Sequence, residues 1–223
     1  MRFEAILFDF DGVIVDSESV ANAALADVLS AEGHAVTPEE ALARYTGLRW
    51  ADCHRLIVEE SGLRLDADAL GDRVDAAIAA RTFEVMAMEG LEPFLEAQSD
   101  RRLAIASSSE TAWLRSTLVR LGLDAWFGDR LFSAAALPRG KPHPDIYLEA
   151  AEALGVAPDR CLVVEDHPLG VAAGAAAGMI VVALLAGSHI RPGHADRVAA
   201  AGAHHVARDY AEVLGIIERL ERG

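Results

Sequence analysis

Two aspartates at the end of an apolar run near the N-terminus constrain this chain more than any other feature. Asp9 and Asp11 follow Ala5-Ile6-Leu7-Phe8, a run typical of a buried β-strand. Neighbouring carboxylates repel one another, and burial penalises the ionised form of each. A fold that keeps both acids at such a strand end needs a cation, or a reaction that uses one carboxylate and one carboxylic acid. Taken alone, the pair also fits a strand that ends in a polar turn.

Hydrophobic periodicity divides the rest of the chain into two parts. The pattern from residue 17 to residue 88 is helical, with Pro38 opening one helix and two more expected at residues 49–60 and 66–86. From residue 90 onward apolar strands alternate with helices, which predicts a parallel sheet covered on both faces. The helical part therefore reads as an insertion after the first strand. The expected strands of the alternating part span residues 3–9, 102–106, 131–132, 161–164, 180–184 and 204–207, and its helices span residues 111–121, 145–154, 170–177, 196–202 and 209–220.

Polar and charged residues gather at the ends of the expected strands and in one loop before a helix. Because the carboxyl ends of parallel strands meet at one edge of a sheet, we expect these side chains to converge. Ser107 with Glu110 also fits a helix capping box, and Glu165-Asp166 also fits an ordinary helix start. Those interpretations would have to hold at successive strand ends together, which favours a shared site. The residues concerned are Asp9, Asp11, Ser107, Ser108, Ser109, Lys141, Glu165 and Asp166.

The net charge of the chain limits the kinds of molecule that it can bind. The net charge of −15 at pH 7 argues against a protein that binds nucleic acid through a basic face. The same charge repels an anionic substrate, so a local cation would have to attract it. Lys141 is the one lysine among 20 lysine and arginine side chains. Chance in an arginine-rich composition is one explanation, and a phosphate site in which a guanidinium would not fit is the other.

The sequence also bears on cellular location. No run is long and apolar enough for a membrane span, and no signal-peptide pattern is present. The two cysteines, Cys53 and Cys161, do not have the spacing of a zinc site or a disulfide framework. We therefore expect a cytoplasmic protein with reduced thiols, without a membrane or nucleic-acid partner. We expect a monomer, with a dimer as the alternative.

Four motifs resemble, in order, those of the haloacid dehalogenase (HAD) superfamily of phosphotransferases. Residues 9–18, Asp-Phe-Asp-Gly-Val-Ile-Val-Asp-Ser-Glu, are similar to the first motif. Ser107 is similar to the second, Lys141 to the third and Glu165-Asp166 to the fourth. The similarity is strongest to the bacterial sugar-phosphate phosphatase and β-phosphoglucomutase branch.

This resemblance implies both a fold and an activity. The implied α/β fold is a Rossmann-like, doubly wound parallel sheet at residues 1–15 and 89–223, with an inserted α-helical cap domain at residues 16–88. The implied activity is Mg²⁺-dependent hydrolysis of a small phosphate monoester. The substrate would be a small phosphorylated metabolite: a sugar phosphate, a sugar-acid phosphate such as 6-phosphogluconate, or a polyol phosphate.

The resemblance also implies a role for each motif residue. Asp9 attacks phosphorus and forms an aspartyl-phosphate, while Asp11 protonates the leaving oxygen and then activates the water that hydrolyses the intermediate. The phosphate ligands implied are Gly12, Ser107, Ser108 and Lys141. The Mg²⁺ ligands implied are Asp9, Asp11 through its backbone carbonyl, Asp166, and Glu165 directly or through water.

Substrate selection is expected from the inserted part. Arg49 lies in a segment that resembles the substrate loop of the cap, and it could clamp a carboxylate or a second phosphate. Its alternative role is a solvated helix start. Ser109 could reach the same ligand from the sheet domain. The roles of His167, His189 and His194 stay open. The last two could be ligands, but we expect them to lie in a surface loop.

Other activities found on this fold would require different sets of residues. A β-phosphoglucomutase carries a histidine shortly after the first motif, where this chain has Ser19-Val20-Ala21. A 2-haloacid dehalogenase would not need Asp11 together with the acids of the fourth motif. A phosphonatase would need a lysine in the cap, where this chain has none. A non-catalytic binding protein would not need every motif residue.

Overall fold

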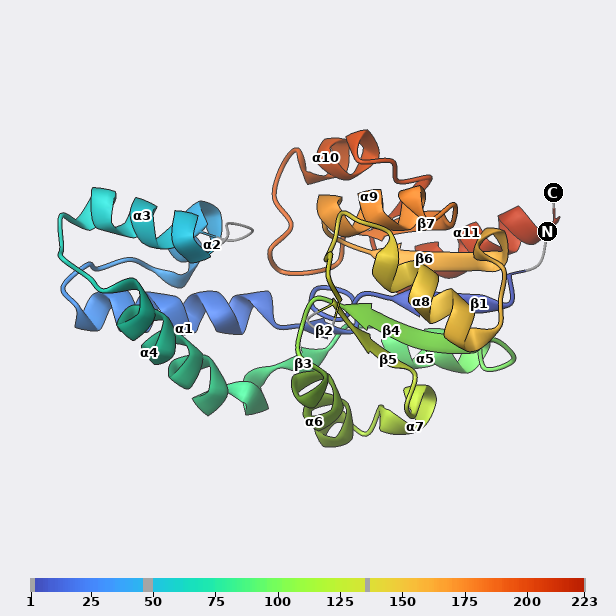
Figure 1. The fold of residues 1–223 in the computed structure, drawn as a ribbon, viewed down its shortest axis with the longest axis horizontal. Helices are drawn as coiled ribbons and strands as arrows, with labels where there is room; N and C mark the ends of the chain where they lie inside the picture. Colours follow the sequence, from blue (N-terminus) through green and yellow to red (C-terminus); the bar gives the residue numbers. More distant parts are fainter. Residues whose placement is uncertain (1–2, 46–49, 135–136, 223) are drawn as a thin grey trace. The chain divides into compact units, whose positions relative to one another are not determined.

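The computed structural model describes residues 3–45, 50–134 and 137–222, and the chain divides into two compact units. One unit comprises Met1–Val15 and Ala87–Gly223, and the other comprises Asp16–Met86. Figure 1 traces the chain through both units. Each unit has its own cluster of buried apolar side chains, as expected of a separate hydrophobic core.

The larger unit is built on a parallel sheet of six described strands in the order β5-β4-β1-β6-β7-β8 (Figure 1). β1 lies between β4 and β6, with Phe8 opposite Ile105 on one side and Val164 on the other. The prediction of a Rossmann-like α/β fold is confirmed. The strands are β1 (Ala5–Phe8), β4 (Arg102–Ser107), β5 (Leu131–Ser133), β6 (Cys161–Glu165), β7 (Ile180–Leu184) and β8 (His205–Ala207). The helices are α5 (Leu91–Ala97), α6 (Thr111–Leu121), α7 (Asp124–Phe127), α8 (Asp145–Leu154), η3 (Pro158–Arg160), α9 (Pro168–Ala176), α10 (His194–Ala200) and α11 (Tyr210–Arg222).

Side chains of β1 are buried on both faces of the sheet. Leu7 belongs to a core cluster with residues of α8 and α9. Phe8, one position later, packs edge-to-face with Phe94 of α5 and Phe127 of α7, at ring-centroid distances of 6.1 and 5.9 Å. Successive strand residues point to opposite faces, so a strand covered on both sides has to be apolar throughout. This explains the uninterrupted apolar run before Asp9.

The smaller unit is helical. Its helices are α1 (Glu18–Ala31), α2 (Pro38–Tyr45), α3 (Trp50–Ser61), α4 (Ala67–Ala80) and the short 3₁₀ helix η1 (Thr82–Glu84). The two-residue strands β2 (Val15–Asp16) and β3 (Met86–Ala87) pair where the chain passes between the units. The predicted helix over residues 66–86 is too long. The α-helix ends at Ala80, because residues 82–84 form the 3₁₀ helix η1 and Met86 begins β3.

Among the described helices of the larger unit, the α-helices α5 and α7 and the 3₁₀ helix η3 were not predicted. α5 has seven residues with Pro93 in its first turn, and α7 has four. Neither is long enough to show a helical period in the sequence. Within the residues described, no helix has the combined length and apolar character needed to cross a bilayer. Cys53 and Cys161 are free and buried.

Tyr210 of α11 anchors the loop that follows β1. Its hydroxyl donates a hydrogen bond to the Val13 carbonyl at 2.9 Å, and its ring lies 4.9 Å from that of Phe94. Both Tyr210 and Val13 are buried. The contact ties the loop containing Asp11 to the C-terminal helix.

Tyr210→Phe should therefore lower the free energy of unfolding by about 1–3 kcal/mol, because a buried carbonyl loses its donor. Urea denaturation followed by circular dichroism measures the change. Val206→Ala, an exposed substitution on β8, should stay within about 0.5 kcal/mol of the wild type. Equal stability of Tyr210→Phe and the wild type would show that the anchor contributes nothing.

Candidate active site

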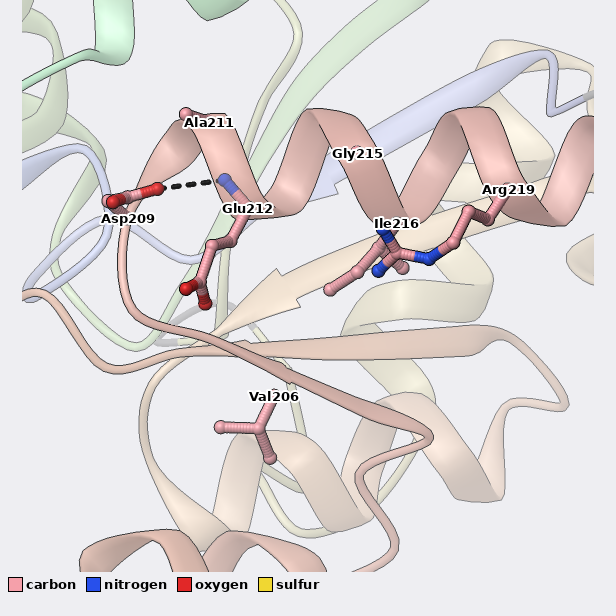
Figure 2. Close-up of a pocket in the computed structure, with 7 residues that line it drawn as sticks. All are labelled: Val206, Asp209, Ala211, Glu212, Gly215, Ile216 and Arg219. Carbon is pink, nitrogen blue, oxygen red and sulfur yellow. Dashed lines mark hydrogen bonds between the residues drawn. The ribbon is translucent and has the colours of Figure 1, made fainter.

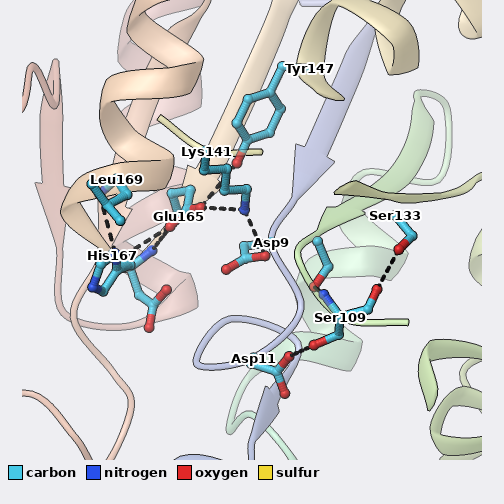
Figure 3. Close-up of polar contacts among 11 residues, drawn as sticks. Asp9, Asp11, Ser109, Ser133, Lys141, Tyr147, Glu165, His167 and Leu169 are labelled. Carbon is cyan, nitrogen blue, oxygen red and sulfur yellow. Dashed lines mark hydrogen bonds and ion pairs between the residues drawn. The ribbon is translucent and has the colours of Figure 1, made fainter. Parts of the chain in front are cut away.

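The predicted site residues of the larger unit lie at the carboxyl edge of its sheet. Asp9 follows β1 directly, with its backbone N–H donating to the Val164 carbonyl of β6 at 3.0 Å. Ser107 ends β4, and Glu165 ends β6. Lys141 comes from the loop before α8 and reaches the same place (Figure 3). Parallel pairing of β1 with both neighbours brings these strand ends together.

Lys141 joins two carboxylates from different strands. Its Nζ lies 2.9 Å from Asp9 Oδ1 and 2.6 Å from Glu165 Oε1, and its side chain is only 7% exposed (Figure 3). Burial alone would lower the pKa of Lys141. The charges of Asp9 and Glu165 outweigh that effect and hold its pKa well above the ordinary value. Lys141 is therefore a fixed positive charge.

Glu165 has both carboxylate oxygens engaged. Oε1 accepts from Lys141 Nζ and from the Tyr147 hydroxyl at 3.2 Å. Oε2 accepts from the backbone N–H groups of Asp166 and His167, each at 2.8 Å. The carboxylate is fully buried, and a side chain at Gly170 of α9 would collide with it. Glu165 thus orders both Lys141 and the turn into α9.

Asp9, Glu165 and Asp166 form a cluster of carboxylates. Each offers one oxygen, and the three oxygens lie within 4.8 Å of one another. With all three ionised, their charge of −3 meets one Lys141 charge of +1, which leaves −2. Oxygen donors with this excess negative charge fit a divalent cation such as Mg²⁺. The residues that could hold such an ion are therefore those of this cluster.

Burial also marks Asp9 as an unusual acid. The pKa of Asp9 is raised from 3.8 to about 6, chiefly by burial, with Lys141 opposing this increase and the Glu165 charge contributing to it. Without a cation beyond Lys141, the ionised form of Asp9 is destabilised. A divalent ion next to it would favour the carboxylate.

A second polar chain holds Asp11. The Ser109 hydroxyl donates to Asp11 Oδ2 at 2.6 Å, and the Ser133 hydroxyl donates to the Ser109 carbonyl at 2.7 Å (Figure 3). The alternative interpretation of Ser107 as part of a helix capping box does not hold. Ser107 Oγ accepts from the backbone N–H of Ser109 at 3.0 Å, and α6 begins after Glu110, which does not cap it with its side chain. Ser107 therefore stabilises the loop of residues 107–110, called the serine loop below, and does not cap the helix.

Of the remaining predicted residues, the structure describes Gly12 and Ser108 but not Arg49. Gly12 lies in the turn after Asp11 with φ of +81°, and Ser108 is exposed on the serine loop. Arg49 and the rest of residues 46–49 lie outside the described residues. Trp50 donates from Nε1 to the Ala67 carbonyl at 3.1 Å and packs on the core of the helical unit.

The loop around His189 and His194 is exposed at Ser188, Pro192 and Gly193, but the two histidines themselves are buried. The side chain of His189 is 6% exposed and His194 is 4% exposed, and both lie against Asp166. No spacing in the sequence indicated this contact, because the segment returns from β7 to the end of β6. His167, beside Asp166, caps α9: its Nδ1 accepts from the Leu169 N–H at 3.3 Å (Figure 3). Burial lowers the pKa of His167.

A surface pocket elsewhere in the larger unit contains none of the predicted site residues. It lies along α11 beside β8, where the Asp209 carboxylate accepts from the Glu212 backbone N–H at 2.8 Å (Figure 2). That contact is an ordinary helix cap. The lining residues are Val206, Asp209, Ala211, Glu212, Gly215, Ile216 and Arg219. The carboxylate cluster, and not this pocket, is the candidate site.

Known proteins are similar to this chain in both sequence and fold. A family model for haloacid dehalogenase-like hydrolases matches residues 3–178. The 6-phosphogluconate phosphatase of Escherichia coli (strain K12) is 31% identical over 193 residues, covering 86% of this chain and 86% of that protein. The beta-phosphoglucomutase of Mycobacterium tuberculosis (strain CDC 1551 / Oshkosh) is 31% identical over 242 aligned positions, covering 96% and 92%. A HAD family hydrolase of Deinococcus radiodurans R1, crystallised with bound phosphate and sodium, is 34% identical with a TM-score of 0.83, covering 95% and 93%.

The raised pKa of Asp9 predicts a pH-dependent effect of Asp9→Asn on stability in metal-free protein. Between about pH 4 and pH 6 the folded wild type binds a proton more tightly than the unfolded chain, so it loses stability as the pH rises. The variant lacks this titration. Its stability relative to the wild type should therefore increase across this window, by on the order of 3 kcal/mol, and level off above it.

Denaturation in the presence of EDTA at several pH values measures this difference. Asp129→Asn, at a side chain that is 94% exposed, controls for the loss of one negative charge. Parallel curves for Asp9→Asn and the wild type would contradict a strained, buried Asp9 carboxylate.

Proposed function

Because the chain belongs to the haloacid dehalogenase-like hydrolases, we propose that it is a phosphatase acting on a small sugar phosphate or related phosphate monoester. One observation carries the proposal: Lys141 contacts the first-motif Asp9 and the fourth-motif Glu165, next to Asp166. This arrangement combines a nucleophile, a fixed cation and a set of oxygen donors for a metal. Phosphoryl transfer depends chiefly on such positioning and charge stabilisation.

The proposed cofactor is Mg²⁺, held by Asp9, Asp166 and the backbone carbonyl of Asp11. When bound, it supplies positive charge that offsets the repulsion between Asp9 and an anionic substrate. Glu165 contributes its charge to the cluster and holds Lys141. Its oxygens already accept four hydrogen bonds, which favours an orienting role and contact with the ion through water.

The first proposed step is transfer of the phosphoryl group to Asp9. A carboxylate oxygen of Asp9 forms a bond to phosphorus as the ester P–O bond breaks, giving an aspartyl-phosphate. Asp11 donates a proton to the departing oxygen, which leaves as an alcohol. The contact with Ser109 supports this role, because it fixes the orientation of the Asp11 carboxyl group.

The second step regenerates the enzyme. Asp11, now ionised, takes a proton from a water molecule whose oxygen attacks phosphorus. The bond between phosphorus and Asp9 breaks, and inorganic phosphate leaves. Lys141 and Ser107 are proposed to hold phosphoryl oxygens in both steps, with Gly12 and Ser108 beside them.

The proposed substrate class comes from relatives and from the inserted helical unit. One curated relative is named as acting on 6-phosphogluconate, a phosphorylated sugar acid. We assign substrate selection to the helical unit as a cap, with Arg49 as the residue that binds a carboxylate or a second phosphate. Ser109 is the corresponding candidate in the larger unit. We also propose a cytoplasmic monomer.

A β-phosphoglucomutase activity is the second candidate, because a relative of that name aligns with 96% of this chain. A mutase returns the phosphoryl group to a sugar hydroxyl, whereas a phosphatase returns it to water. The residues Ser19-Val20-Ala21, where that branch carries a histidine, favour the phosphatase.

Phosphate release from a panel of phosphorylated sugars, sugar acids and polyols tests the proposal. We expect Mg²⁺-dependent release that EDTA abolishes and added Mg²⁺ restores. Asp9→Asn should reduce hydrolysis of an aryl phosphate by at least about 10⁴-fold, since the nucleophile is lost. Glu110→Gln, an exposed change at the end of the serine loop, is the matched control and should remain active.

Three outcomes would contradict parts of the proposal. Full turnover by Asp9→Asn would remove the nucleophile assignment. Full activity after chelation would favour a dehalogenase-type reaction without metal. Conversion of β-glucose 1-phosphate to glucose 6-phosphate, dependent on a bisphosphate and without phosphate release, would establish the mutase.

A further inference from the structure

Two buried histidines from one loop contact Asp166 at two different atoms. His189 Nε2 lies 2.8 Å from Asp166 Oδ2, and His194 Nε2 lies 2.6 Å from the Asp166 backbone oxygen. His189 comes from the segment after β7, and His194 begins α10. The two rings pack edge-to-face, with centroids 5.8 Å apart. Asp166 is therefore held at its side chain and at its main chain by the same stretch of chain.

The partners of His194 fix its tautomer. Nη2 of Arg197 lies 2.9 Å from His194 Nδ1, and an arginine can only donate hydrogen bonds. Nδ1 therefore accepts, and the ring proton is on Nε2, where it can be donated to the Asp166 carbonyl. Arg197 is one turn further along α10, so the start of this helix sets the orientation of the ring. The lowered pKa of His194, from burial and the Arg197 charge, is consistent with a neutral ring.

The same reasoning applies to His189. A carboxylate oxygen only accepts, so the contact with Asp166 Oδ2 places a proton on His189 Nε2. This hydrogen bond restricts rotation of the carboxylate. A ligand held in this way meets a cation in one orientation.

Two glycines provide the space for the His189–Asp166 pair. A side chain at Gly12, in the loop after Asp11, would collide with the Asp166 carboxylate and lie 2.9 Å from His189 Cε1. A Cβ at Gly187 would lie 2.7 Å from both Cε1 and Nδ1 of His189. Such distances require the ring to move. The ring of His189 therefore keeps its position only because Gly12 and Gly187, which lie against it, have no side chains.

We propose that His189 and His194 are positioning residues that preorganise Asp166 for a small divalent cation. The inference rests on the proposed function, because it takes Asp166 as a ligand of the Mg²⁺ used there. His189 sets the direction of the carboxylate, and His194 sets the backbone from which it projects. Mg²⁺ demands nearly ideal octahedral geometry, whereas Ca²⁺ accepts flexible sites. Loosening Asp166 should therefore weaken Mg²⁺ binding more than Ca²⁺ binding.

Calorimetric titration of the full-length, metal-free protein with Mg²⁺ and with Ca²⁺ tests this inference. His189→Ala should weaken Mg²⁺ binding about 10- to 100-fold and reduce the ratio of Mg²⁺ to Ca²⁺ affinity. His189→Asn, which keeps an N–H donor, should recover part of the loss. His194→Ala should act in the same direction. His205→Ala is the matched control, since β7 separates its strand β8 from β6.

Thermal melting in EDTA separates positioning from folding. A positioning role predicts that the melting temperature of each metal-free variant stays near that of the wild type while its Mg²⁺ affinity falls. If His189→Ala does not fold, Gly187→Ala keeps the histidine but displaces its ring, and it should show the same loss of Mg²⁺ affinity.

The possible failures are distinguishable. A wild-type protein that binds no divalent cation would remove the proposed function, and this inference with it. Wild-type binding that His189→Ala and His194→Ala leave unchanged, with the same Mg²⁺ to Ca²⁺ ratio, would overturn the inference alone. A change of equal size in the His205→Ala control would also overturn it.

Discussion

A single buried ammonium between two carboxylates organises this site. Lys141 contacts Asp9 and Glu165 at 2.9 and 2.6 Å, and without it both acids would face each other in a region of low dielectric. Its one charge does not balance the three carboxylates of the cluster, and burial has already raised the pKa of Asp9 to about 6. The remaining negative charge is the physical reason to expect a divalent cation. That cation would also let a protein with a net charge of −15 receive an anionic substrate.

The topology of the sheet makes this concentration of charge possible. β1 lies between β4 and β6, so their carboxyl ends deliver Asp9, Ser107 and Glu165 to one edge. β1 is apolar and buried along its whole length, and the polar side chains that β4 and β6 contribute to the site, Ser107 and Glu165, are the last residues of their strands. Those strand ends are also where backbone N–H groups of the following turns become available. Glu165 uses two of these N–H groups, from Asp166 and His167.

The sequence predicted the parts of the structure that depend on local pattern. Apolar runs followed by acids located β1 and β6, and the alternation of strands with helices led to the parallel sheet. The convergence of Asp9, Lys141 and Glu165 followed from strand ends sharing an edge. The sequence did not predict short helices such as α5, because seven residues are too few to establish a helical period of apolar residues. The helix beginning at Ala67 stopped earlier than predicted because the chain changes to a 3₁₀ helix and then to β3 within the predicted span.

The partners of individual polar side chains were beyond the reach of sequence pattern. Ser107 sits at a spacing that matches a capping box, yet its hydroxyl accepts from Ser109 within the serine loop. His189 and His194 lie in a glycine-containing stretch that looks like any surface loop. Only the return of that stretch onto the end of β6 places them against Asp166. The geometry of such a return depends on tertiary packing, which leaves no periodic trace in the chain.

Diffraction from crystals grown with Mn²⁺ in place of Mg²⁺ tests the central claim most directly, because Mn²⁺ prefers similar oxygen ligands and scatters anomalously. The account predicts one strong anomalous peak in contact with carboxylate oxygens of both Asp9 and Asp166, with Lys141 still bound to Glu165. No peak at saturating Mn²⁺, or a peak confined to acids elsewhere on the surface, would contradict it.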